Sequence, residues 1–126
     1  MKILKISLIT LTALILHSCG INSFNKYNAA NEKNKKWIEM EPHQDSILYI
    51  ISNYKNGVRN GNAKIYYEDN IVGKGKYKNG LKQGEWLFYK KGILFRKELF
   101  KEGIKTKYEE IENGKVVKSV IITPSF

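Results

Sequence analysis

Few side chains in this sequence could take part in chemistry. Cys19 is the only cysteine, which excludes an internal disulfide bond and a cysteine-based metal cluster. After residue 18 the sequence has one histidine, His43, in the segment EPHQDS, and no nucleophile can be assigned to it as part of a catalytic set. We therefore predict no enzymatic activity, no bound metal and no cofactor.

Two further clusters have simpler explanations than a binding site. Glu109, Glu110 and Glu112 could attract a cation, but neighbouring residues of a strand point to opposite faces, so the three carboxylates cannot share one site. The segment 73–76, GKGK, resembles part of a phosphate-binding loop, yet the complete motif and its following helix are missing. We interpret the glutamates as a solvated strand surface and the GKGK segment as a weak match to a phosphate loop.

The N-terminal segment has the pattern of a secretory signal. Positive charge near the start is followed by residues 6–16, which are apolar apart from one serine and two threonines. This run is too short to span a bilayer, and the small Ser18 suits a cleavage site directly before Cys19. We predict that residues 1–18 are a signal peptide.

The segment Leu16-His17-Ser18-Cys19 resembles the lipobox of bacterial lipoproteins. That motif has a leucine three residues before the cysteine and a small residue directly before it. His17 departs from it, because lipoproteins more often have a small or aliphatic residue there. The resemblance implies that the Cys19 sulfur takes a diacylglyceryl group and that the new N-terminus is acylated, which holds a protein on a membrane at about 0.8 kcal/mol per buried methylene. The alternative is a free thiol in an uncleaved hydrophobic N-terminus.

A polar stretch, GINSFNKYNAANEKNKK, follows at residues 20–36 and has no sustained apolar periodicity. Asparagine recurs there at every third position, which a solvated linker explains more simply than a ladder of ligands. We predict that residues 19–36 form a disordered tether, which would hold the folded domain roughly 20–25 Å from the lipid.

From residue 37 onward, short runs of β-branched and aromatic residues alternate with glycine and asparagine. The sequence YKNGVRNG at 54–61 returns as YKNGLKQG at 77–84, a spacing of 23 residues. Comparison of 54–76 with 77–99 gives seven identities, whereas about two are expected by chance. These observations favour a tandem repeat of β-hairpins.

Two sets of residues define the predicted repeat. Glycines tolerate the backbone angles of tight turns and bends, and we expect such positions at Gly57, Gly61, Gly80, Gly84 and Gly103. Apolar and aromatic residues at equivalent places should form the repeat core: Leu48, Tyr54, Ile65, Ile71, Tyr77, Trp86, Phe88, Leu94, Phe100, Ile111 and Val117. Leu48 and the core residues at steps of 23 from it should lie side by side on consecutive strands as a spine.

The series Tyr-Lys-Asn-Gly, then Gly-x-Trp-x-x-Tyr and a glycine turn, resembles MORN-type repeats and is most similar to the variant in bacterial proteins described as antitoxin-like. The resemblance covers residues 37–114, with a degenerate opening unit and a closing strand over 116–126. It implies an elongated antiparallel β-meander of stacked hairpins. We therefore predict an all-β repeat domain over residues 37–126.

The unit at 100–123 departs from this pattern. Lys107 replaces the second glycine, and Glu109 and Glu112 replace the tryptophan and the tyrosine. Such divergence is typical of a terminal repeat, which has solvent on one side.

The charge of the chain indicates which partners its surface could attract. The formal net charge is +10, and it falls to +8 once Lys2 and Lys5 leave with the signal peptide. A basic surface attracts anionic lipid headgroups, nucleic acid or acidic polymers, but a composition rich in lysine and asparagine is the simpler explanation of the charge. We expect no nucleic-acid partner, because an exported domain rarely meets one.

These observations lead to one leading hypothesis and two alternatives. The chain would be a membrane-anchored, non-enzymatic lipoprotein of the bacterial cell envelope, with its domain outside the cytoplasm and on either membrane. The repeat sheet would serve as an interaction or scaffold module for another envelope protein or ligand. The alternatives are a module that binds anionic lipid headgroups and an antitoxin or immunity protein that neutralises a toxin. The fold alone does not name the ligand.

Overall fold

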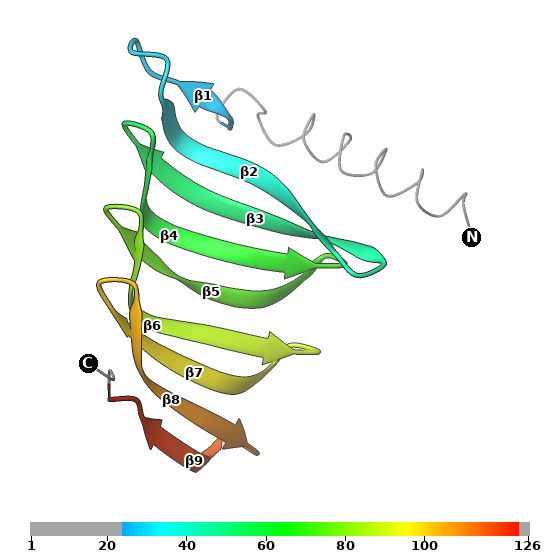
Figure 1. The fold of residues 1–126 in the computed structure, drawn as a ribbon. Helices are drawn as coiled ribbons and strands as arrows, with labels where there is room; N and C mark the ends of the chain where they lie inside the picture. The colour runs from blue at the N-terminus through cyan, green and yellow to red at the C-terminus, as the bar shows by residue number, and fades with distance from the viewer. Residues whose placement is uncertain (1–23, 124–126) are drawn as a thin grey trace.

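The computed structural model describes residues 24–123, which form one antiparallel sheet of nine strands. The strands follow one another in chain order, so the sheet is an open meander, as Figure 1 shows. The predicted all-β antiparallel meander is confirmed. The signal peptide, Ser18 and Cys19 lie outside the described residues. The strands are β1 (Lys26–Tyr27), β2 (Lys33–His43), β3 (Ser46–Lys55), β4 (Val58–Tyr67), β5 (Asn70–Lys78), β6 (Leu81–Lys90), β7 (Ile93–Lys101), β8 (Ile104–Glu112) and β9 (Lys115–Ile121).

Two-residue turns join the strands from β3 to β9. Both residues of each of these six turns have positive φ, which is the geometry of the type I′ turns that match the twist of a hairpin. Gly57, Gly80 and Gly103 each occupy the second position, with φ of 79°, 82° and 81°. Glycine meets no steric penalty there, so these turns can form with little strain.

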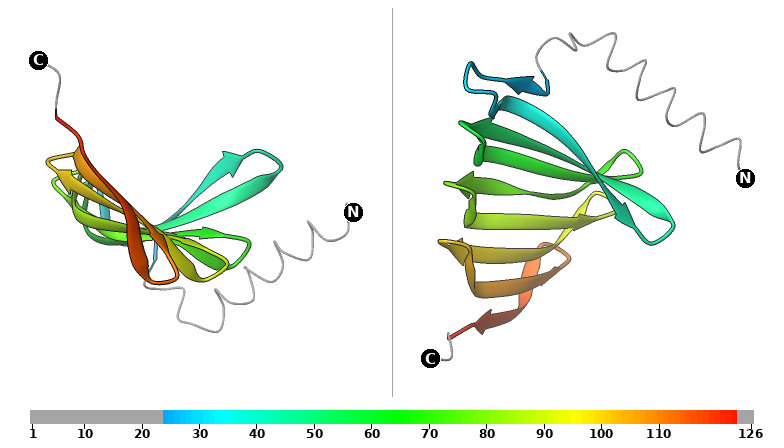
Figure 2. Two further views of the ribbon diagram at one scale, coloured as in Figure 1. Left: turned by 90° about the horizontal axis from the view of Figure 1, so that it is seen from below. Right: turned by 45° about the horizontal axis from the view of Figure 1, so that its top comes forward.

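Four of the buried residues, Trp37, Ser52, Ala63 and Trp86, lie in one row across the middle of one face of the sheet. Trp37, Ser52, Ala63 and Gly75 are in direct cross-strand register, and the Trp86 ring lies over Gly75. Trp86 is 0% exposed, and Ser52 and Ala63 are 1% and 2% exposed. Small residues on some strands therefore leave room for the rings of others. We call this side of the sheet the aromatic face; the twist and curvature of the sheet are visible in Figure 2.

The sheet begins earlier than the sequence predicted. The tether was expected to extend through residue 36, but residues 24–36 include β1, a turn and the start of β2. The side-chain oxygen of Asn28 accepts hydrogen bonds from two backbone N–H groups of that turn, each at 2.9 Å. The Trp37 indole donates to the Lys26 carbonyl at 3.1 Å. A polar segment can thus be ordered when its asparagines bind the backbone instead of water.

Gly61 and Gly84 lie inside β4 and β6, not at bends between strands as expected. Their φ angles are 104° and 71°, and each stands at a register shift in the ladder. At each shift, one residue of the preceding strand faces three residues of the strand that carries the glycine. These glycines therefore permit bulges, which bend and twist a strand without ending it.

The corresponding shift in β8 is smaller, because only Thr106 is added there. As a result Tyr108, not Glu109, takes the place opposite Glu98 that Trp86 takes on the other side of β7. Lys107 stands where the other units have their second glycine. With this change the register of β8 shifts by one residue, so the side chains that point to each face of the sheet are exchanged.

The predicted spine on consecutive strands is wrong. A step of 23 residues spans a whole hairpin, so its members lie on every second strand: Leu48 on β3, Ile71 on β5, Leu94 on β7 and Val117 on β9. Val117 also falls at a register shift and is 54% exposed. Of the other predicted core residues, Trp86 and Ile111 are buried and the rest are partly exposed, because a single-layered sheet covers each side chain from one side only.

Candidate interaction surface

Aromatic rings and cations alternate along the aromatic face. The Lys82 ammonium lies 4.6 Å from the centre of the Trp86 ring and 5.0 Å from that of Phe100. Tyr77 and Phe100 pack edge-on against Trp86 with centroids 5.2 and 6.5 Å apart. Burial of the ammonium lowers the pKa of Lys82, and the ring faces compensate part of the lost hydration.

The first strands repeat this arrangement. The Lys33 ammonium lies 4.7 Å from the Trp37 ring and 5.0 Å from the Tyr54 ring, and Tyr27 packs edge-on against Trp37 at 4.9 Å. Each tryptophan also donates its indole N–H to a carbonyl of the preceding strand. The aromatic face therefore has two similar cages, each made of aromatic rings around one lysine ammonium.

The middle of the aromatic face has a related cage without a tryptophan. The Arg59 guanidinium lies 5.9 Å from the Tyr54 ring and 5.3 Å from the Tyr77 ring. Ala63 occupies the strand position that Trp86 occupies two strands later. Cations therefore bridge the rings from β1 to β7 on one continuous surface.

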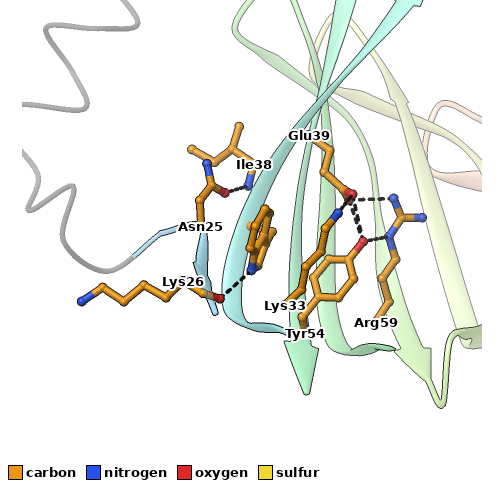
Figure 3. Close-up of polar contacts among 8 residues, drawn as sticks. Asn25, Lys26, Lys33, Ile38, Glu39, Tyr54 and Arg59 are labelled. Atoms are coloured by element: carbon orange, nitrogen blue, oxygen red, sulfur yellow. Dashed lines mark hydrogen bonds and ion pairs between the residues drawn. The ribbon is translucent and has the colours of Figure 1, made fainter. Parts of the chain in front are cut away.

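Glu39 connects the cage around Lys33 to the cage around Arg59, as Figure 3 shows. Its carboxylate accepts hydrogen bonds from the Lys33 ammonium at 2.8 Å, from Arg59 at 2.7 Å and from the Tyr54 hydroxyl at 2.9 Å. Burial opposes ionisation, but these donors outweigh it and hold the pKa of Glu39 at about 2, well below its usual value. The cluster cross-links β2, β3 and β4. Because three donors already bind the Glu39 carboxylate, it is not available to exchange a proton with a substrate.

The opposite face, which we call the lysine face, has the reverse property. Lys64 on β4 and Lys74 on β5 are directly opposite each other, and Lys76 faces Asn62. None of these lysines belongs to an ion pair within residues 24–123. Like charges at directly opposed positions repel, so this part of the sheet carries uncompensated positive charge.

These three lysines line an open groove of about 580 Å³ that extends from β4 to β6. Gln83, Glu85 and Leu87 line its other side. Three amines outnumber the single Glu85 carboxylate, so the groove suits an anionic or polar ligand.

The residues that the sequence offered for chemistry are engaged elsewhere. His43 ends β2, where its ring packs edge-on against Tyr67 at 6.3 Å. Glu109 accepts a hydrogen bond from Lys107 at 2.6 Å, and Glu110 lies 3.6 Å from the Lys118 ammonium. Over the part of the chain that the structure describes, no three metal-ligating side chains gather and no helix is long and apolar enough to cross a membrane.

Sequence reasoning missed the groove, although one signal for it was present. In a strand, the alternating sequence GKGK puts the side chains of Lys74 and Lys76 on the same face. The comparison with a phosphate-binding loop treats this segment as a loop and not as a strand, so it does not predict a lysine surface. Lys64 joins them only through the register between β4 and β5.

Comparison of the chain with models of known protein families, with curated proteins and with solved structures gave no match. The candidate function therefore rests on the residues and geometry described above.

Proposed function

We propose that this chain is a membrane-anchored lipoprotein whose sheet acts as a non-enzymatic interaction module in the bacterial cell envelope. The observation that carries the module is the contrast between its two faces. The cations of the aromatic face lie against rings and carboxylates, whereas the three lysines of the open groove form no ion pair within residues 24–123, and of these Lys74 lies 5.4 Å from the Tyr89 ring. A surface that leaves its charge uncompensated is suited to a partner that supplies the opposite charge.

We also infer that the hairpins are copies of one unit of 23 residues and are similar to MORN-type repeats. Contacts that recur at this spacing support the inference. Gly80 N–H donates to the Arg59 carbonyl at 2.8 Å, and Gly103 N–H donates to the Lys82 carbonyl at 2.9 Å. The Asn60 and Gln83 side chains likewise each accept from a backbone N–H nineteen residues further on.

The anchor is tested at Cys19. Replacing Cys19 with alanine removes the sulfur that would carry the diacylglyceryl group, so incorporation of radiolabelled palmitate should fall to background. A Ser18→Ala variant keeps a small residue before the cysteine and should label like the wild type. Equal labelling of the wild type and the Cys19→Ala variant would refute the anchor.

A more specific role is binding of anionic lipid headgroups, which the lysine groove favours. A lysine near an anionic membrane contributes about 1 kcal/mol. Changing Lys64, Lys74 and Lys76 together to glutamine should therefore weaken binding of the non-lipidated chain 19–126 to phosphatidylserine vesicles by about 100-fold at low salt. Vesicle co-sedimentation over a series of salt concentrations measures this.

The matched control changes three exposed lysines at strand ends, Lys55, Lys78 and Lys101, to glutamine and so removes the same net charge. We expect a much smaller loss in this control. Equal losses in the two triple variants would mean that total charge, not the groove, attracts the membrane. Binding that ignores both lipid charge and salt would exclude this role.

A further inference from the structure

The two edges of the sheet differ in how they are covered. β1 and a bridge from Phe24 pair with the first part of β2. The rest of β2 contains Pro42, which has no backbone N–H to offer to another strand. β9 is the last strand of the sheet and has no neighbour beyond it among residues 24–123. Its apolar side chains are also open to solvent, with Val116 53% and Ile121 77% exposed. The β9 edge is therefore the one at which the sheet can be extended.

The outward backbone groups of β9 can be identified from one hydrogen bond. Ile122 N–H donates inward to the Thr106 carbonyl at 2.8 Å. In an antiparallel strand, successive residues direct their N–H and C=O groups alternately to the two sides. Ser119 and Ile121 therefore present their backbone donors and acceptors outward.

We propose that β9 pairs antiparallel with β9 of a second copy of this chain, about a two-fold axis at Ser119. A two-fold axis perpendicular to the sheet makes a continuous sheet in which paired residues share a face. With Ser119 on the axis, the two Ser119 residues form a hydrogen-bonded pair. Val117, where the register with β8 shifts, then faces Ile121 of the second copy, so apolar residues lie opposite each other.

Other registers fit less well. An axis at Lys118 would place two ammonium groups side by side and would bring inward-directed backbone groups to the centre. An axis at Val117 or Ile121 would also bring outward-directed backbone groups to the centre, but fewer residues of the two strands would then pair. In the Ser119 register Lys118 faces Val120, and its ammonium stays near the Glu110 carboxylate and the Tyr108 ring of its own chain, 3.6 and 5.6 Å away. The lysines of β9 therefore do not prevent this pairing.

The first test is cross-linking of the full chain in its native membrane. We expect Ser119→Cys to give a covalent dimer with a short bismaleimide, because the two thiols would lie next to each other. Lys91→Cys, in the exposed turn between β6 and β7, is the matched control and should remain monomeric. Both variants are also made with Cys19→Ala, so that the native thiol contributes nothing and the outcome does not depend on lipidation.

The second test removes one backbone donor. Ser119→Pro deletes an outward N–H but leaves the inward ladder to β8 intact, whereas Ser119→Ala deletes the same hydroxyl and keeps the N–H. By symmetry two hydrogen bonds are lost, and we expect dimerisation of the purified full chain to weaken about tenfold or more in Ser119→Pro alone. Circular dichroism should be the same for both variants. Absence of a Ser119→Cys dimer, equal cross-linking at residue 91, or equal dimerisation of the two Ser119 variants would overturn the proposal.

Discussion

Replacing Gly75 with alanine should lower the free energy of unfolding of the chain by about 3 kcal/mol, at the upper end of the usual cost of overpacking. A β-carbon at this position would overlap the indole ring of Trp86. The ring cannot move aside easily, because it is fully buried and donates a hydrogen bond to the Lys76 carbonyl at 3.2 Å. Urea denaturation of the non-lipidated chain, followed by tryptophan fluorescence and circular dichroism, measures the change.

A double-mutant cycle separates this overlap from a general intolerance of alanine. Trp86→Ala alone should cost about 3–5 kcal/mol, because it empties the largest buried position. In that background Gly75→Ala should cost almost nothing, since the ring is gone and alanine is less flexible than glycine. Gly73→Ala is the matched control on the same face of β5, where the nearest atom to a new β-carbon, on Ile65, is 3.3 Å away. Equal costs at residues 73 and 75 would contradict the predicted overlap.

The Glu39 cluster should make the protein sensitive to acid. The pKa of Glu39 is about 2 in the folded chain, below its ordinary value of 4.5. The lowered pKa stabilises the fold at every pH above 4.5, and this stabilisation is lost as the pH falls from 4.5 towards 2. Linkage gives about 3 kcal/mol for a shift of this size. Solvent screening of a side chain that is 21% exposed reduces the stabilisation to about 2 kcal/mol. Chemical denaturation at neutral pH and at several values in this window measures the loss.

Glu39→Gln should remove most of this pH dependence and should destabilise the protein at neutral pH by a similar amount. Glu41→Gln is the matched control, because Glu41 lies two residues further along β2 and belongs to none of the ion pairs within residues 24–123. If Glu39→Gln and the wild type lose stability in parallel between pH 4.5 and 2, the stabilising role of the cluster is wrong.

Much of the fold follows from short-range patterns. Side chains alternate along the segment after Gly84, which puts Trp86 and Phe88 on one face of β6 and Leu87 on the other, and the cross-strand pairs agree with this pattern. Asn-Gly pairs such as Asn79-Gly80 predict tight turns with positive φ, which the structure has. These features depend on neighbouring residues alone, because side-chain direction has a period of two and turn geometry depends on two central residues.

The register between strands does not follow from such patterns. A bulge of two residues at Gly84 and of one residue at Thr106 cannot be distinguished locally, yet the difference brings Tyr108 in place of Glu109 opposite Glu98. Register also sets Lys64 against Lys74 and so creates the groove. Each of these pairings depends on packing between strands. For example, the Trp86 ring fits over Gly75 because glycine has no side chain, and this contact requires one particular register of β5 and β6. The position of a strand along its neighbour is an outcome of packing across the whole sheet, and no local pattern encodes it.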